Sequence, residues 1–464
     1  MPVGIHGGLR RCAANPPYSR SASRRRSGFS RDRFKANGIA DKSAPTTAQS
    51  PLSLITLAEP LALLRSYSLA TSTYSRLDLI RFFAACLAGF LGGHLTNYAV
   101  ILFAQDVWGM DALAGAGFAL CFGVPLLLGW PAGAWCDQHS PQRIAQFAHG
   151  AFLLALLLLA AASRNQAFGV PLYLLGATCA GVGWALLAPA RMALLGRLAG
   201  ERQAKLAVLF NLLVMLGFGL APLLLALARN LGGWPAVHGS GLLLFGLSAG
   251  LLVGLRVPGL GGAGHVLERV QQGFAYVRAT PLLAQALLAA VLIYLAMGPI
   301  QVMLPRFAQQ TLQLSELARG LYLGTLALAL LLGGAVSLWL ARRFGQGRCV
   351  LVAALGSGIA LGLLGQTNSL GLALLCLGLN GIGAGIAVSL IVALLQHESQ
   401  PQLRGRLLSI YTVTSQVVPA AGGLGAGLLL EVLPASQGLL FCGVGLTLLF
   451  GLAGWRLARL RAYA

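Results

Sequence analysis

Negative charge is scarce in this sequence, and so is charge of either sign. Aspartate and glutamate together number 12 among 464 residues, and all charged residues make up only 10% of the chain. Soluble globular proteins carry about 25% charged residues, so the composition excludes an ordinary soluble fold. Hydrophobic residues reach 57% and recur in long runs, which indicates an integral membrane protein.

Several patterns of site chemistry are missing as well. No phosphate-binding loop of the Gly-x4-Gly-Lys-Ser/Thr kind occurs, which argues against an ATP-driven pump. No His/Cys cluster has metal-ligand spacing, and no acidic pair lies within an apolar run, so we expect no metal, no cofactor and no enzyme activity. Among the eight cysteines, no pair falls in a predicted outer loop, so we predict no disulfide.

Positive charge is abundant, with a net charge of +21. Arginine crowds residues 1–76 and the loops expected on the cytoplasmic side, which is a topology signal rather than a sign of nucleic-acid binding. We predict that residues 1–80 form a basic, disordered tail. Three interpretations of this tail stay open: a segment near anionic lipid, a transit-like peptide, or translated sequence upstream of the true start.

The rest of the chain predicts an all-α membrane protein with twelve transmembrane helices, since each span needs about 20 apolar residues. The expected spans are 82–104, 112–134, 144–163, 167–190, 206–228, 236–256, 282–304, 317–340, 349–366, 370–395, 407–430 and 437–457. A longer connection, the linker 257–281, divides them into two six-helix bundles, 81–256 and 282–464. Such a division is typical of a duplicated transporter architecture.

Arginine and lysine placement supports this topology with both termini in the cytoplasm. Four arginines fall in predicted outer loops: Arg164, Arg229, Arg306 and Arg319. The predicted inner segments hold many more: Arg143, Arg191, Arg197, Arg202, Lys205, Arg256, Arg269, Arg278, Arg342, Arg343, Arg348, Arg404, Arg406, Arg456, Arg459 and Arg461. We therefore place the protein in the bacterial inner membrane, as a multi-pass protein.

The turn between the second and third spans reads Gly133-Ala-Trp-Cys-Asp137-Gln-His-Ser-Pro-Gln-Arg143. It resembles the signature loop of the major facilitator superfamily at Gly133, Asp137 and Arg143. The resemblance implies a gating loop, in which the glycine permits close helix approach and Asp137 accepts hydrogen bonds at a helix N-terminus. The alternative is an ordinary positive-inside loop. A degenerate copy of this loop, Ala341–Arg348, lies between spans eight and nine, with Arg348 at the position that corresponds to Arg143.

Three further segments are similar to one branch of that superfamily, the bacterial exporters related to the enterobactin exporter. They are 267–283, 298–308 and 403–411. The resemblance implies secondary-active export of a drug-like or siderophore-like molecule by alternating access, by a monomer. Gly217-Phe-Gly219-Leu-Ala221-Pro222 partly matches the antiporter motif of span five. A lysophospholipid or lipid transporter, or a non-transporting membrane sensor, is the alternative on the same scaffold.

Polar residues inside the spans are candidates for the substrate cavity, because buried polar groups in membranes usually face a cavity or a partner. In the family, spans 1, 4, 7 and 10 surround the cavity. The candidates on these spans are His94, Asn97, Tyr98, Trp184, Arg191, Tyr294, Gln301 and Asn380. The alternative for each is an interhelical hydrogen bond.

Two of these residues have competing roles. His94 titrates near neutrality, so it is either a proton-coupling group or a neutral histidine held between helices. Arg191 either pairs with an anionic substrate or extends its charged end to the membrane interface. The expected partners are therefore a small-molecule substrate, membrane lipid and protons.

Overall fold

The computed structural model describes residues 75–463 except 166, 256 and 258–265, without the side chains of a few further residues such as Asp137. The predicted basic tail lies outside the described residues, apart from its last few positions. Those positions already belong to a helix, which begins at Arg76 rather than near residue 82. A capping box fixes this start, since the Asp78 amide donates to Ser75 Oγ at 3.1 Å and the Ser75 amide donates to Asp78 Oδ2 at 3.1 Å.

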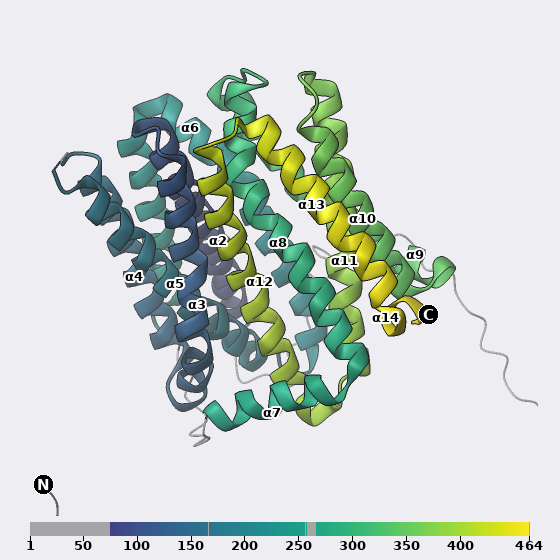
Figure 1. Ribbon diagram of the computed structural model, residues 1–464. Helices are drawn as coiled ribbons and strands as arrows, with labels where there is room; N and C mark the ends of the chain where they lie inside the picture. The colour runs from purple at the N-terminus through teal and green to yellow at the C-terminus, as the bar shows by residue number, and fades with distance from the viewer. Residues whose placement is uncertain (1–74, 166, 256, 258–265, 464) are drawn as a thin grey trace, which may run out of the picture. The chain divides into compact units, whose positions relative to one another are not determined.

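The described chain is helical throughout, as Figure 1 shows. Its helices are α2 (Arg76–Val107), α3 (Asp111–Gln138), α4 (Pro141–Ala162), α5 (Gly169–Ala199), η1 (Gly200–Arg202), α6 (Gln203–Leu252), α7 (Val266–Ala279), α8 (Pro281–Gln310), α9 (Glu316–Phe344), α10 (Gln346–Leu364), α11 (Leu370–Glu398), α12 (Pro401–Leu430), α13 (Ala435–Arg456) and α14 (Ala458–Ala462).

The membrane-spanning pattern confirms the predicted architecture. Within the described residues, 11 helices are long and apolar enough to cross a membrane. One of them, α6, contains two spans, because Gly232 and Gly233 leave the helical conformation in its middle. Gly233 has φ of +64°, which glycine adopts without steric cost. The chain therefore crosses twelve times, and the loop expected between spans five and six is only this break.

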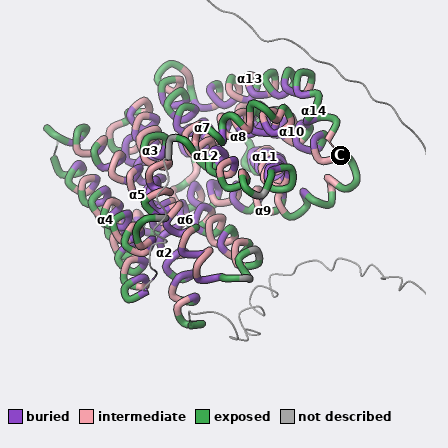
Figure 2. The backbone as a smooth tube through the Cα atoms, turned by 90° about the horizontal axis from the view of Figure 1, so that it is seen from below, coloured by how far each residue is buried: buried purple, intermediate pink, exposed green. Residues whose placement is uncertain are grey.

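Helices α2 to α6 form the first half of the described unit, and α8 to α13 form the second half (Figure 2). The halves meet where α3 packs on α12 and α6 packs on α9. The amphipathic α7, in the predicted linker, lies near both halves (Figure 1). Its Phe274 ring lies 6.3 Å from the ring of Trp130 on α3, and its Tyr276 hydroxyl accepts from the Gln400 amide at 3.1 Å.

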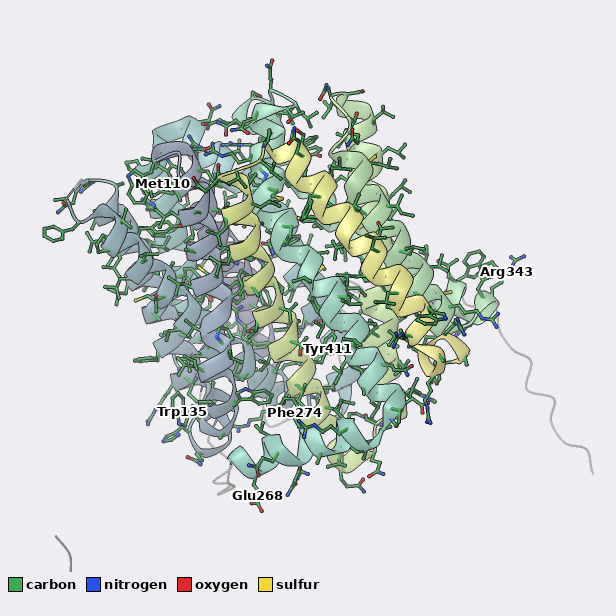
Figure 3. All side chains as sticks on the ribbon, in the orientation of Figure 1. Met110, Trp135, Glu268, Phe274, Arg343 and Tyr411 are labelled. Atoms are coloured by element: carbon green, nitrogen blue, oxygen red, sulfur yellow. The ribbon has the colours of Figure 1, made fainter. Side chains whose placement is uncertain are left out.

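The two ends of the bundle are named here by two labelled residues. Met110, between α2 and α3, marks the Met110 end, and Trp135, near the end of α3, marks the opposite Trp135 end (Figure 3). At the Met110 end the interior is tightly closed, since every residue from Leu95 to Gln105 of α2 and from Gly298 to Ala308 of α8 is buried.

The signature-like turn differs from the prediction in its backbone. Helix α3 continues to Gln138, so Asp137 is helical and the turn is reduced to His139 and Ser140 before α4 starts at Pro141. The expectation that Gly133 permits a close approach of two helices is wrong, because a Cβ atom at this position would meet nothing within 4 Å. Arg143 has an exposed side chain, as a positive-inside residue would.

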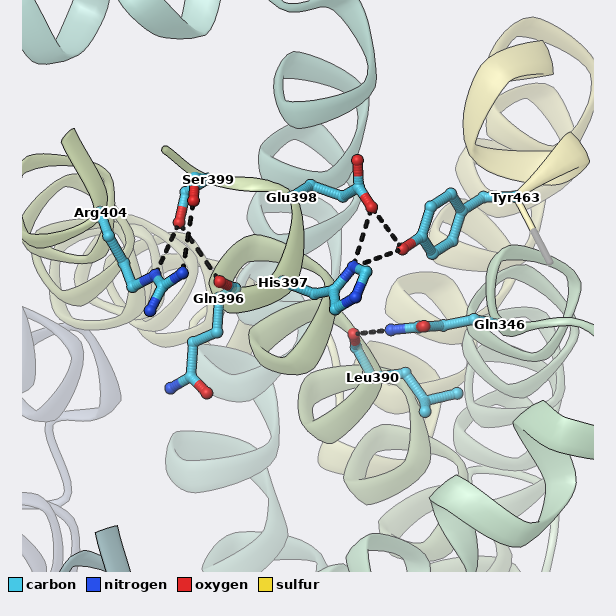
Figure 4. A network of polar contacts seen from close by, with 8 residues as sticks. All are labelled: Gln346, Leu390, Gln396, His397, Glu398, Ser399, Arg404 and Tyr463. Atoms are coloured by element: carbon cyan, nitrogen blue, oxygen red, sulfur yellow. Dashed lines mark hydrogen bonds and ion pairs between the residues drawn. The ribbon is translucent and has the colours of Figure 1, made fainter. Parts of the chain in front are cut away.

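Arg348, in the corresponding turn of the second half, has an exposed side chain. Other residues hold this turn in place. The Gln346 amide group donates to the Leu390 carbonyl at 2.7 Å, and Tyr463 Oη donates to Glu398 Oε1 at 2.8 Å (Figure 4). Burial and the Glu398 carboxylate raise the pKa of Tyr463 to about 12, so the phenol keeps its proton. These bonds connect the last part of α11 to the start of α10 and to Tyr463, which follows α14.

Candidate substrate site and gate

Four of the predicted cavity residues come together inside the first half. The indole Nε1 of Trp184 on α5 donates to Asn97 Oδ1 on α2 at 2.9 Å. The His94 ring lies 5.3 Å from the Trp184 ring and 5.3 Å from the Phe218 ring of α6. Tyr98, one turn further along α2, is buried and packs against the same Phe218. The helical spacing predicted this shared face.

Small residues of α2 make the room for these α5 side chains. A Cβ atom at Gly93 would lie 2.6 Å from Cζ2 of Trp184, and one at Gly89 would overlap the guanidinium of Arg191. Glycine at both positions therefore lets an indole and a guanidinium approach the α2 backbone. The sequence indicated close packing by glycines of other spans, but not this pair.

Arg191 is buried, with only 2% of its surface exposed. Its guanidinium carbon lies 4.3 Å from the centre of the Phe90 ring, which is a cation–π contact. Among the described residues its Nη2 atom has no hydrogen-bond partner. The interpretation of Arg191 as an arginine reaching the membrane interface is therefore wrong, because its charged end points into the helix bundle.

The predicted residues of the second half do not form one group. The hydroxyls of Tyr294 on α8 and Tyr411 on α12 are 2.7 Å apart. Gln301 is buried in the closed Met110-end half of α8. Asn380 donates to the carbonyl and the hydroxyl of Ser357 on α10, both at 2.9 Å, so it makes an interhelical hydrogen bond rather than facing a shared cavity.

A buried ion-pair network joins the two halves at the Met110 end, and it was not predicted as a site. Asp106, at the end of α2, forms ion pairs with Arg229 of α6 and, at 2.8 Å, with Arg319 of α9. Arg229 also pairs with Glu316 of α9 at 2.8 Å. The side chains of Asp106 and Arg319 are each only 6% exposed, so solvent screens their interaction weakly.

A second set of polar contacts lies beside this network. Arg306 of α8 pairs with Asp111 of α3 at 2.7 Å. Gln105 donates to Asp111 Oδ1 at 2.9 Å and to the Val302 carbonyl at 3.0 Å, which again joins α2 to α8. The Ala112 amide donates to Glu431 at 2.8 Å. We call the ion-paired residues Asp106, Asp111, Arg229, Arg306, Glu316 and Arg319 the gate cluster.

The sequence carried a signal for the gate cluster. Positive charge is depleted from outer loops, yet three of the four predicted outer arginines belong to this cluster. The acidic residues Asp106, Asp111 and Glu316, which also lie at the outer ends of predicted spans, belong to it as well. Opposite charges gathered at the same end of different spans indicate ion pairs between them. The pairing itself needs the tertiary structure, since Asp106 and Arg319 are 213 residues apart.

Backbone contacts reinforce this closure. A Cβ atom at Gly115 of α3 would lie 2.7 Å from the Gly423 carbonyl oxygen of α12. Gly320 of α9 faces α6 in the same way, with its Cβ position 2.8 Å from the carbonyl oxygen of Pro222 in the antiporter-like segment. Ion pairs and close helix contacts between the halves thus lie together, and their breaking would part the halves at this end. Such an arrangement has the properties of a gate.

Comparison with characterised proteins shows relatives over most of the described chain. The enterobactin exporter EntS of Shigella boydii serotype 18 is 29% identical over 332 residues, which cover 68% of this chain and 78% of that protein. The EntS protein of Shigella boydii serotype 4 is 28% identical over 389 residues, covering 80% of this chain and 90% of that protein.

Solved structures with the same fold are more distant in sequence. The nucleoside transporter NupG superposes with a TM-score of 0.66 at 14% identity, covering 82% of this chain and 99% of NupG. A bacterial homologue of the iron transporter ferroportin, in its inward-facing state, superposes with a TM-score of 0.65 at 18% identity, covering 85% of this chain and all of that one.

The family model of the Major Facilitator Superfamily matches residues 81–423 and 286–462. Its two matches overlap and together extend from the first span to the last, in agreement with the twelve crossings and the two packed halves. The chain is a multi-pass membrane transporter that belongs to the Major Facilitator Superfamily.

Proposed function

We propose that this transporter exports a small organic molecule, drug-like or siderophore-like, from the bacterial cytoplasm by alternating access. The observation that carries the proposal is the gate cluster, in which charges of one half pair with those of the other at the Met110 end. Breaking and remaking these pairs allows two rigid halves to rock about a site between them. The relatives named as enterobactin exporters support the outward direction.

The orientation is part of this proposal: the Trp135 end and both termini face the cytoplasm. Exposed arginines gather in the turns and terminal segment of that end, as the positive-inside rule requires. They include Arg143, Arg278, Arg342, Arg343, Arg348, Arg404, Arg456, Arg459 and Arg461. The gate cluster then closes the outer side, and the state described is one in which the outside is sealed.

Cysteine labelling of intact cells tests the orientation. Met110 and His139 are both exposed and lie in turns at opposite ends of α3, so Met110→Cys and His139→Cys form a matched pair. We expect a membrane-impermeant maleimide to label Met110→Cys in intact cells, and His139→Cys only after permeabilisation. The opposite pattern would invert the proposed topology.

An efflux assay tests the transport itself. The protein is expressed in a strain that lacks its own multidrug and siderophore pumps, and export of a panel of organic substrates is measured. Export of at least one substrate is expected, and its rate should fall at least tenfold in Asp106→Asn at equal protein level. No export of any panel member, together with unchanged lipid exchange between vesicle leaflets, would contradict a transport function.

Proton coupling through His94 is tested in the same assay with His94→Gln. The ring is packed against the rings of Trp184 and Phe218, and an ionised group at membrane depth is costly without a partner. We therefore expect His94→Gln to keep the dependence of efflux on the pH gradient, with at most a severalfold lower rate. Loss of that dependence with the rate at zero gradient retained would identify His94 as the coupling group.

A further inference from the structure

Three buried polar nitrogen atoms without partners lie beside α2 inside the first half. They are Nη2 of Arg191, Nε2 of His94 and the amide nitrogen Nδ2 of Asn97, and each is buried with no hydrogen-bond partner among the described residues. Asn97 uses its oxygen to accept from Trp184, so its free group is a donor. From Gly89, where the guanidinium lies, to Asn97 the α2 axis rises about 12 Å.

No acceptor of matching charge balances these nitrogen atoms. Arg191 takes part in no ion pair in the part of the chain that the structure describes. Cys86 and His94 of α2 and His149 of α4 lie near it, and none of them is a carboxylate. An unpaired buried cation is costly, and an intramembrane arginine normally has a partner of opposite charge.

Neighbouring polar groups do not fill this role. Ser248 of α6 donates its proton to the Ala85 carbonyl at 2.7 Å, so the contact of 2.8 Å between His149 Nε2 and Ser248 Oγ uses the histidine as donor. The other ring nitrogen, His149 Nδ1, is buried and has no hydrogen-bond partner among the described residues, but it carries no negative charge. The Phe90 ring stabilises the guanidinium from one face but leaves the in-plane N–H groups free to bind a ligand.

One of the three groups lies at the end of an accessible stripe of α2. Ile80, Ala84, Leu87, Leu91 and His94 repeat at helical spacing and are exposed or half-buried. The stripe stops at His94, beyond which α2 is buried up to Gln105. The Arg191 guanidinium lies at Gly89, on the other side of α2 and inside the helix bundle.

We propose that Arg191 binds an anionic group of the transported molecule, a carboxylate, a phosphate or an acidic phenol, and that His94 and Asn97 form hydrogen bonds with other polar atoms of the same molecule. The inference rests on the proposed transport function and narrows its substrate class to organic anions. A planar guanidinium binds two oxygen atoms of such a group at once, which lysine cannot do. The anion supplies the charge that Arg191 lacks, and the aromatic rings beside His94 contact the rest of the molecule.

Binding of matched probes to the purified protein tests the proposal. The soluble pair is 2-naphthoate and its neutral counterpart 2-naphthamide, and the lipid pair is lysophosphatidate and monoolein. We expect at least one anion to bind roughly tenfold or more tightly than its neutral partner, since a charge-assisted bond is worth at least that factor. A preference only for lysophosphatidate identifies a lipid phosphate as the source, and one only for naphthoate a soluble acid.

Variants assign the preference to the site. Arg191→Gln should reduce the anion's affinity by roughly 10- to 100-fold and leave the neutral probe unchanged, and Arg191→Lys should recover only part of the loss. Arg164→Gln removes a positive charge from an exposed turn and serves as the matched control. Size-exclusion profiles identify a variant that fails to fold, and in that case Arg191→Lys against the wild type decides the outcome.

The failure of this inference is distinct from the failure of the proposed function. Equal binding of each anion and its neutral partner, binding of neither anion, or an unchanged anion affinity in Arg191→Gln would each overturn the anion site. The efflux assay would still show export of a neutral substrate in that case. Anion binding that depends on Arg191 without export of any substrate would instead overturn the proposed function and keep the site.

Discussion

Asp106→Asn is expected to open the Met110 end and reduce efflux by at least tenfold. Asp106 pairs with Arg229 of the first half and Arg319 of the second, so the neutral variant leaves the buried Arg319 without an anionic partner and Arg229 with Glu316 alone. Removing one partner of a buried ion pair costs about 3–5 kcal/mol. Since 1.4 kcal/mol is about a tenfold change in an equilibrium, the population of the closed state relative to the open state would fall by a factor of roughly 100 to a few thousand.

Spin labels at Met110→Cys and Gln310→Cys measure this opening. The two positions are exposed at the Met110 ends of the first and second half, and the native cysteines are replaced beforehand. The wild type should give one short distance distribution, and Asp106→Asn should add a longer one. Glu268→Gln, which removes an exposed carboxylate from α7 at the opposite end, is the control and should leave the distribution unchanged.

A double-mutant cycle separates the pair from its surroundings. Arg319→Gln alone should also open the gate, but less than Asp106→Asn, because Asp106 keeps Arg229 as a partner. If the two residues act through one ion pair, the double variant is less open than the sum of the single effects. Additive effects, or a closed distribution in Asp106→Asn, would show that the network does not hold the gate.

The fold could be predicted from the sequence to a large extent, because a span is recorded locally, in the length of an apolar run and in the charge of its flanks. The ends of the helices are harder to predict from the sequence. Helix α3 extends through Asp137 to Gln138, since nothing in Asp137-Gln138 terminates a helix until Pro141 starts the next one. The sequence predicts a loop between spans five and six, but in the structure the two non-helical glycines Gly232 and Gly233 are enough to separate these spans.

The site was predictable only where its residues share one helix. Spacing placed His94, Asn97 and Tyr98 on one side of α2, and the structure agrees. Spacing cannot tell which neighbouring helix that side meets. Asn380 therefore turned out to bind Ser357 of α10, and the partners of Asp106, far away in the chain, could not be derived from local pattern at all.

The steric counterpart of the Asp106 experiment is Gly115→Val, for which we expect complete loss of efflux with the fold retained. A Cβ atom at this position would lie 2.7 Å from the Gly423 oxygen and 2.9 Å from Gly427 Cα. These are backbone atoms of α12, which cannot move aside as a side chain would. Since α3 and α12 belong to different halves, each half can still pack, but the two cannot meet at the Met110 end.

The control is Gly150→Val on α4, where a Cβ atom would meet nothing within 4 Å. It carries the same cost in helix propensity and should keep efflux and the short Met110–Gln310 distance. A wild-type efflux rate in Gly115→Val would show that α3 and α12 need not touch during transport.

The two gate variants should differ in kind, because one weakens an attraction and the other blocks an approach. Asp106→Asn still permits the closed state at a free-energy cost, so its distance distribution should hold both populations and its efflux should be slow but measurable. Gly115→Val excludes the closed contact, so only the long distance and no efflux are expected. Residual transport in the first variant and none in the second would indicate that closure of the Met110 end is an obligatory step of the cycle. The reverse order would mean that the ion pairs, rather than the helix contact, are indispensable to it.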